Sequence, residues 1–96
     1  MSVINSFKDS IENGRMPSGL SLPLQALWYD GAGDWQRGHD LIDQLGDRAS
    51  AHVHAYFHRK EGDLWNADYW YRRAGQKRPD ASLDEEWGQL VELYYL

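Results

Sequence analysis

Three of the four histidines in the chain lie within seven consecutive positions. His52, His54 and His58 occur in the stretch AHVHAYFHRKEGD, residues 51–63. On a helix His54 and His58 share one face because they are four residues apart, so both imidazoles reach a single zinc or nickel ion. His52 is rotated from His54 by roughly 200°, at about 100° per residue, and points elsewhere.

Two further residues are candidates to complete a metal site around His54 and His58. Glu61 lies three positions after His58, where its carboxylate adds a ligand or orients the imidazole through a hydrogen bond. His39 joins the set if the preceding helix packs alongside. The alternative is that the histidines fill space on a packed helix face and bond to neighbouring polar groups. The metalloprotease motif HExxH is excluded because Ala55 follows His54.

The acidic residues are explained by helix geometry instead of catalysis. Asp34 and Asp63 precede predicted helices and act as N-caps. The acidic run 84–86 falls in the first turn of another predicted helix, where negative charge complements the helix dipole. The sequence contains no serine nucleophile elbow, phosphate-binding loop or dinucleotide fingerprint, and GAGD at 31–34 is typical of a turn. We therefore predict no enzymatic activity and no cofactor.

The composition indicates one small helical domain spanning residues 1–96. Hydrophobic residues make up 42% of the chain and aromatic residues 14%, with five tryptophans, which favours a core built from large rings. Threonine is absent and the other β-branched residues are scarce, which favours helices over sheets. The rings predicted to form the core are Trp28, Trp35, Phe57, Tyr71 and Trp87.

Charge and cysteine content exclude several classes of function. The formal net charge of −5 argues against general nucleic-acid binding, which needs a basic surface. The absence of cysteine excludes disulfides and thiolate metal sites. No signal-peptide core is recognisable, and no apolar run approaches the roughly 18 residues of a membrane span. We expect a cytoplasmic protein without membrane or nucleic-acid partners.

Capping and breaking residues divide the chain into six predicted helices. A helix at 3–12 is followed by a loop to residue 20, and the next helices are expected at 21–30, 34–45, 47–62 and 63–75. Ser82 and Glu85 form a capping box before the last helix. The expected organisation is an N-terminal helix and loop (1–20), two helical hairpins (21–46 and 47–79) and a C-terminal helix (80–96).

The two predicted hairpins repeat each other with a shift of 29 residues. The shift superimposes Ala26 on Ala55, Trp28 on Phe57, and the pair 33–34 on the pair 62–63, which both read Gly-Asp. Gly38 then falls on Ala67, so small residues recur where two helices must approach closely. A fixed period with helix–turn–helix content is typical of stacked helical repeats.

Residues 21–80 resemble the tetratricopeptide-like repeats, including shorter relatives with a Trp-Tyr pair in the second helix. The closest stretch is YWYRRAG at 69–75. The first-helix pattern of the second repeat is matched by Ala51, His54, Ala55 and His58, and its second-helix pattern by Ala67, Tyr71, Ala74 and Pro79. The period is shorter than usual, and the first repeat has Gly38 and Ile42 in place of alanine and an aromatic residue and lacks the closing proline. The resemblance implies stacked hairpins with a C-terminal capping helix.

The second helix of the better repeat carries more aromatic rings than one face can bury. Trp65 and Tyr69 form a stripe distinct from the packing stripe of Ala67, Tyr71 and Ala74. With Trp70, Arg72 and Arg73, this stripe is the candidate partner-binding surface. The alternative is that the first helix or the C-terminal residues Tyr94, Tyr95 and Leu96 cover these rings.

We expect a non-enzymatic module that binds a protein or peptide, because helical repeats provide extended surfaces for recognition. Self-association into a homodimer is a close variant of this expectation. The alternative function is that of a small metal- or ligand-binding protein that uses His54, His58 and Glu61.

Overall fold

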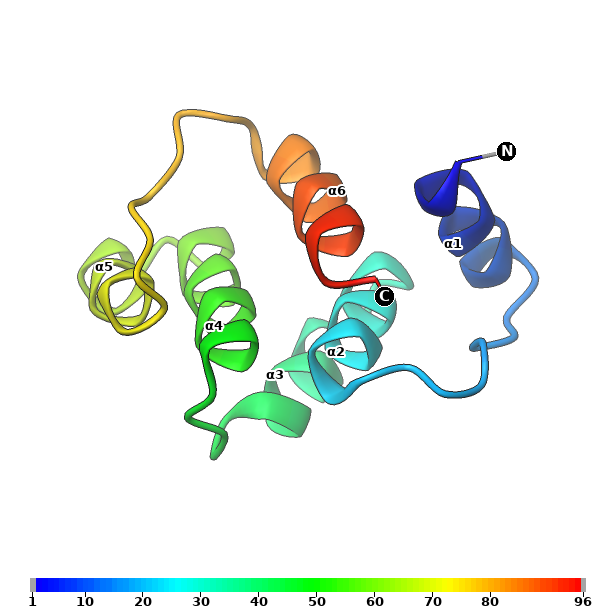
Figure 1. Ribbon diagram of the computed structural model, residues 1–96, viewed down its shortest axis with the longest axis horizontal. Coiled ribbons are helices and arrows are strands. Elements are labelled where there is room, and N and C mark those ends of the chain that lie inside the picture. Colours follow the sequence, from blue (N-terminus) through cyan, green and yellow to red (C-terminus); the bar gives the residue numbers. More distant parts are fainter. Residues whose placement is uncertain (1, 96) are drawn as a thin grey trace.

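The computed structural model describes residues 2–95, which fold into six α-helices with no strand among them (Figure 1). The prediction of an all-α fold is therefore confirmed. The helices are α1 (Val3–Glu12), α2 (Leu22–Gly31), α3 (Trp35–Ile42), α4 (Arg48–Lys60), α5 (Leu64–Arg73) and α6 (Leu83–Tyr94). None of the helices in this part of the chain combines the length and apolar character needed to cross a membrane.

Each helix begins at a polar N-cap side chain that accepts a hydrogen bond from a backbone N–H three residues later. The caps are Ser2, Ser21, Asp34, Asp47, Asp63 and Ser82. The backbone N–H of Ser82 also donates to the Glu85 side chain, and this reciprocal bond confirms the capping box. These bonds satisfy backbone donors that the helix itself leaves free, which is why capping residues located the helix starts in the sequence.

Helix α3 is shorter than the sequence predicts. It ends at Ile42 instead of continuing to Leu45, because the backbone N–H of Leu45 donates to the carbonyl of Ile42 in a tighter turn (3.0 Å). Asp43 thereby becomes the C-cap residue. Asp43 keeps helical backbone angles and lies one helical turn after His39, beside the side chains discussed below.

Helices α2 and α3 pack closely as one hairpin, and α4 and α5 pack closely as a second. Their turns are built alike. The backbone N–H of Asp34 donates to the carbonyl of Tyr29 (2.8 Å), and the backbone N–H of Asp63 donates to the carbonyl of His58 (2.9 Å). The glycine before each aspartate has a positive φ, 90° and 86°, which favours glycine. The 29-residue shift of the sequence is therefore present in the backbone of both turns.

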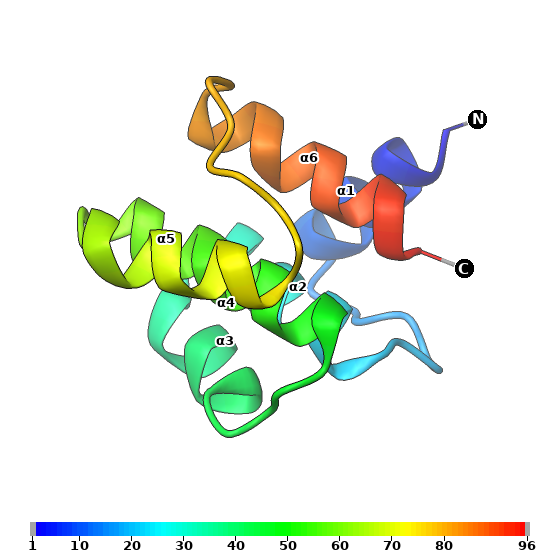
Figure 2. The same cartoon turned by 60° about the vertical axis from the view of Figure 1, so that its left-hand side comes forward.

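Helix α4 is the centre of the molecule and contacts α2, α3, α5 and α6 (Figures 1 and 2). Trp28, Phe57, Tyr71 and Trp87 are buried as predicted. Trp35 is only partly buried; its indole N–H donates to the carbonyl of Phe57 (3.2 Å).

Two buried carboxylates tie α4 to the helices that flank it. Asp30 of α2 accepts hydrogen bonds from the Tyr56 hydroxyl (2.6 Å) and from Lys60 Nζ (2.9 Å). Glu86 of α6 accepts hydrogen bonds from Arg59 (2.9 Å) and from the Tyr71 hydroxyl (2.6 Å). Because buried charge is tolerated only when it is paired, these contacts fix α2 and α6 against α4.

Candidate metal centre

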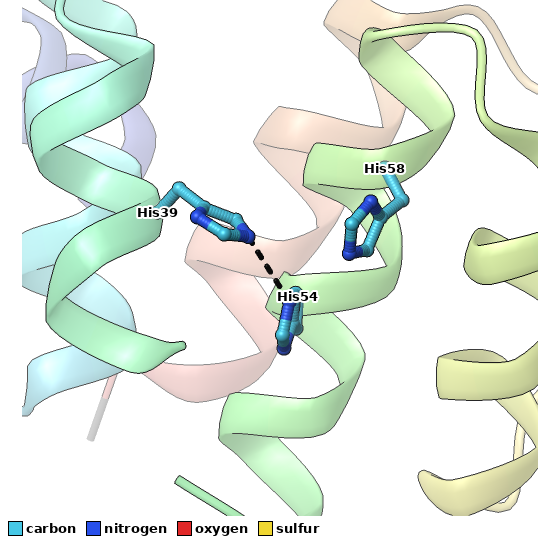
Figure 3. Close-up of side chains that lie close together, drawn as sticks. All are labelled: His39, His54 and His58. Atoms are coloured by element: carbon cyan, nitrogen blue, oxygen red, sulfur yellow. Dashed lines mark hydrogen bonds between the residues drawn. The ribbon is translucent and has the colours of Figure 1, made fainter. Parts of the chain in front are cut away.

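Three imidazoles from two helices converge on one point of the structure (Figure 3). His39 lies on α3, and His54 and His58 lie on α4. Each ring offers a nitrogen, and the three nitrogens lie within 4.8 Å of one another. The Nε2 atoms of His39 and His54 are 3.1 Å apart and share a hydrogen bond, in which the tautomers decide which ring donates. The cluster therefore contains three nitrogen donors at the spacing of a metal site.

Both local and long-range structure bring the histidines together. His54 and His58 are one turn apart on α4, and their rings stack with centroids 4.8 Å apart. His39 reaches them because α3 packs against α4. The spacing in the sequence indicated the first pair, whereas the position of His39 follows only from the packing of the two hairpins.

Aromatic neighbours restrict the orientation of two of the imidazoles. The Trp70 ring of α5 stacks on His54 with centroids 4.1 Å apart. The Trp35 ring stacks on His39 at 4.9 Å, with the two planes 8° from parallel. His54 is 2% exposed, and the other two histidines are partly buried. Side chains of α3, α4 and α5 thus hold the rings in place.

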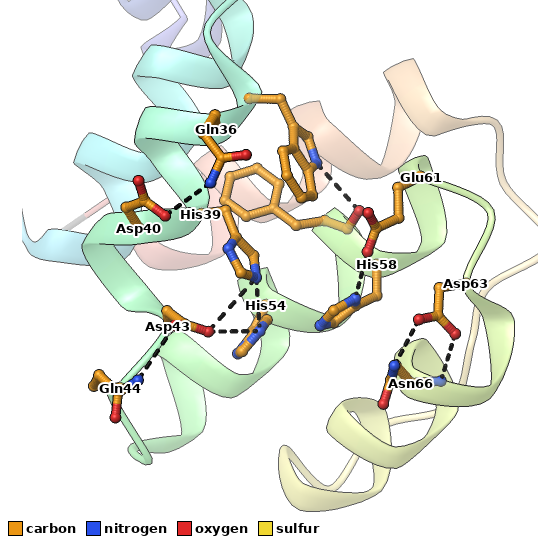
Figure 4. Close-up of polar contacts among 12 residues, drawn as sticks. Gln36, His39, Asp40, Asp43, Gln44, His54, His58, Glu61, Asp63 and Asn66 are labelled. Atoms are coloured by element: carbon orange, nitrogen blue, oxygen red, sulfur yellow. Dashed lines mark hydrogen bonds and ion pairs between the residues drawn. The ribbon is translucent and has the colours of Figure 1, made fainter.

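Glu61 orients His58 and does not face the other two histidines. Its Oε1 atom lies 2.8 Å from His58 Nδ1 (Figure 4). This contact leaves Nε2 of His58 as the nitrogen that turns toward His39 and His54. A carboxylate on the far nitrogen of an imidazole fixes its tautomer and raises its basicity toward a metal. Of the two arrangements expected for Glu61, the structure shows the hydrogen bond to the His58 imidazole.

Asp43 is the carboxylate that faces the imidazole pair. Its Oδ1 atom lies 3.7 Å from Nε2 of His39 and 3.9 Å from Nε2 of His54. The sequence interpretation did not include this residue. The available signal was its position four residues after His39 on the same helical face, but its approach to His54 depends on the packing of α3 against α4.

The surroundings of His54 keep its imidazole neutral. Burial, followed by the neighbouring imidazoles of His58 and His39, lowers the pKa of His54 to about 4, and the Asp43 carboxylate opposes the shift. Only a neutral imidazole has a lone pair to give to a metal. His54 Nδ1 is also buried without a hydrogen-bond partner among the described residues. The ring is therefore available as a ligand at neutral pH.

A second group of possible ligands lies at the surface, where His58, Glu61 and Asp63 offer atoms within 4.8 Å of one another. Its members already have other structural roles. Asp63 caps α5 and accepts bonds from Asn66, and Glu61 holds His58. The fourth histidine, His52, faces away from the cluster and contacts the Tyr94 hydroxyl through Nδ1 (2.7 Å). The three-histidine cluster is therefore the better candidate.

The aromatic stripe on α5 is exposed. Trp65 is 77% exposed and Tyr69 39%, whereas Trp70 is partly buried against His54. Arg72 is exposed, and the Arg73 guanidinium lies over the rings of Trp70 and Tyr69.

The C-terminal residues pack elsewhere instead of covering this stripe. Tyr94 contacts His52, and Tyr95 packs on Phe7; Leu96 lies outside the described residues. Helix α1 contacts α2 and α6. The five residues predicted as a partner-binding surface thus divide into an exposed group and one ring, Trp70, that supports the histidine cluster.

Comparison of the chain with models of protein families, with curated proteins and with solved structures returned no match.

Proposed function

We propose that this helical domain binds one divalent transition-metal ion of the zinc class through His39, His54 and His58. The observation that carries the proposal is the convergence of the three ligand nitrogens, with 3.1 Å between the Nε2 atoms of His39 and His54. Two nitrogens bound to one tetrahedral zinc ion at 2.0–2.1 Å are separated by about 3.3 Å. The separation of the His39 and His54 nitrogens is thus close to that of two ligands on one ion.

The types of ligand support a metal of this class. Imidazole nitrogens suit zinc, copper and nickel; the chain has no cysteine thiolate, and residues 2–95 form no cage of oxygen ligands that would favour other ions. The low pKa of His54 leaves its lone pair free, and Glu61 orients His58 from the opposite nitrogen. A hydrogen bond between His39 and His54 accounts for the approach of these two rings, but it does not account for the nitrogen of His58 at the same place.

The proposal is tested by titrating the chelator-treated protein with zinc in a calorimeter. We expect one ion per chain for the wild type and loss of binding in His39→Ala and His58→Ala. His52→Ala is the matched control, because His52 lies on α4 but contacts Tyr94 outside the cluster. Wild-type protein that binds no zinc, or binding that His52→Ala removes equally, would contradict the proposal.

A second candidate function, binding of a protein or peptide, is favoured by the 77% exposure of Trp65. Large exposed rings next to arginine side chains are frequent at protein interfaces. Self-association is the first form to test, by sedimentation of the wild type and of Trp65→Ala over a range of concentrations. A concentration-dependent increase in mass that the variant loses, at unchanged helical content, would support this function. Equal mass of both proteins at all concentrations would count against self-association.

A further inference from the structure

We propose that Asp43 is the fourth ligand and closes the metal site, so that the bound ion is a structural link between the two helical hairpins. This inference rests on the proposed function and deepens it, because it assigns the complete ligand set and the class of site. The ion would join α3 of the first hairpin to α4 of the second.

The Asp43 carboxylate lies near two of the three imidazoles. Its Oδ1 atom is almost equidistant from the two Nε2 atoms of His39 and His54, at 3.7 Å and 3.9 Å. Ligand atoms on one tetrahedral zinc ion are separated by about 3.3 Å. Both oxygen-to-nitrogen distances are therefore within about half an ångström of the separation between two ligands on one ion.

The local structure directs one oxygen of Asp43 to the imidazoles and holds the other. As the C-cap of α3, Asp43 keeps helical backbone angles and stays on the face of His39, one turn earlier. Its Oδ2 atom accepts a hydrogen bond from the Gln44 side chain (3.2 Å), which leaves Oδ1 for the histidines (Figure 4). Hydrogen bonds of this kind to a ligating carboxylate orient it toward its metal.

The neighbouring carboxylates are engaged elsewhere. Glu61 bonds to Nδ1 of His58, on the side of that ring away from the cluster. Asp40, on α3, accepts a hydrogen bond from Gln36 (2.9 Å). Among these acidic residues, Asp43 is the one whose oxygen approaches two of the three histidines.

A fourth protein ligand decides which class of metal site this is. Catalytic zinc sites keep one position for water or substrate, whereas structural sites are filled by four protein ligands. Three histidines and Asp43 fill a tetrahedral set. The contacts within each hairpin are extensive, whereas α3 and α4 touch each other less. An ion held by both helices therefore adds a link between the two hairpins, whose mutual contacts are less extensive than those within each hairpin.

The test uses cobalt(II) in place of zinc and azide as a probe for an open position. Four-coordinate cobalt absorbs strongly in the visible range, and azide changes this spectrum when it occupies a free site. We expect the wild-type cobalt spectrum to be unaffected by azide. In Asp43→Ala and Asp43→Asn the spectrum should respond to azide, with cobalt bound more weakly by upwards of about tenfold. Asp40→Ala, also on α3, is the matched control and should behave as the wild type.

Both Asp43 variants should fold, because Asp43 is 44% exposed at its side chain, and circular dichroism checks this. A wild-type spectrum that responds to azide as Asp43→Ala does, or unchanged cobalt affinity in both Asp43 variants, would overturn the closed site and leave the three-histidine site standing. Failure of the wild type to bind cobalt at all would overturn the proposed function itself, and this inference with it.

Discussion

At the scale of single residues, the environment of His54 opposes a positive charge. The ring is buried and stacked on Trp70, and its Nε2 atom faces His39, with Asp43 as the nearest carboxylate. The His58 ring, one helical turn later on α4, also stacks on the His54 ring. Burial is the larger influence on the pKa, and the two neighbouring imidazoles act in the same direction. The folded protein thus favours the state in which His54 can bind a metal.

The depressed pKa of His54 predicts that acid destabilises the metal-free protein. The unfolded chain binds a proton near pH 6.5, whereas the folded ring does so near 4. The stability that the neutral His54 ring provides is therefore complete above pH 6.5 and is lost as the pH falls toward 4. This loss lowers the free energy of unfolding by up to about 3 kcal/mol. Urea unfolding of chelator-treated protein between pH 4 and 8 measures this effect.

His54→Gln is the control for this pH profile. His52 also has a pKa lowered by burial and contributes in the same direction, so the difference between the two proteins isolates His54. Between pH 8 and pH 4, the free energy of unfolding of His54→Gln should fall by less than that of the wild type. Two parallel profiles would show that the titration of His54 does not influence stability.

At the scale of helices, the close approach of α3 to α2 depends on one glycine. A Cβ atom at Gly38 would lie 2.5 Å from the backbone carbonyl oxygen of Ala26 and 3.0 Å from the Phe57 ring. The carbonyl belongs to the backbone of α2, so the helices would have to separate. This spacing also sets the distance from His39, one residue later, to α4.

Gly38→Ala should therefore destabilise the protein, by about 1–3 kcal/mol, although alanine has the higher helix propensity. Gly88→Ala on α6 is the matched control, because its Cβ would meet only Ile4 at an ordinary 3.8 Å. At position 88 the higher helix propensity of alanine should therefore stabilise the protein by up to about 1 kcal/mol. Thermal or urea unfolding should therefore show a lower free energy of unfolding for Gly38→Ala and a higher one for Gly88→Ala. Equal effects of the two substitutions would contradict the close approach at Gly38.

The elements were more predictable from the sequence than the site. Helix starts followed from local chemistry, since Asp34, Asp63 and Ser82 bond to backbone groups three residues away. The pairing of His54 with His58 followed from the helical period. His39 and Asp43 reach these residues only through the packing of α3 on α4, and no local rule specifies that contact. The early end of α3 was likewise not visible in the sequence.

At the scale of the whole molecule, α4 organises the fold by bonding to buried acids on both sides. Glu86 is the clearest case, because it is 2% exposed and pairs with both Arg59 and Tyr71. Arg59 also donates to the carbonyl of Ala81, in the loop before α6. These contacts attach the C-terminal helix to the second hairpin.

Glu86→Ala should lower the free energy of unfolding by about 3 kcal/mol or more, because it leaves a mostly buried guanidinium and a buried hydroxyl without their partner. Glu92→Ala, an exposed glutamate on the same helix, should change it by no more than about 0.5 kcal/mol. Urea denaturation of both variants provides the comparison. A small loss in Glu86→Ala, similar to that of the control, would mean that this network does not anchor α6.

The most direct test of the metal centre is the nitrogen NMR spectrum of protein labelled with ¹⁵N in its histidines. The four rings are assigned with single variants, and the chelator-treated protein is then titrated with zinc. At one equivalent, the Nε2 signals of His39, His54 and His58 should shift together to metal-bound values while His52 stays unchanged. Spectra unaffected by zinc, or zinc shifts on His52 equal to those of the other three, would contradict a metal centre at this cluster.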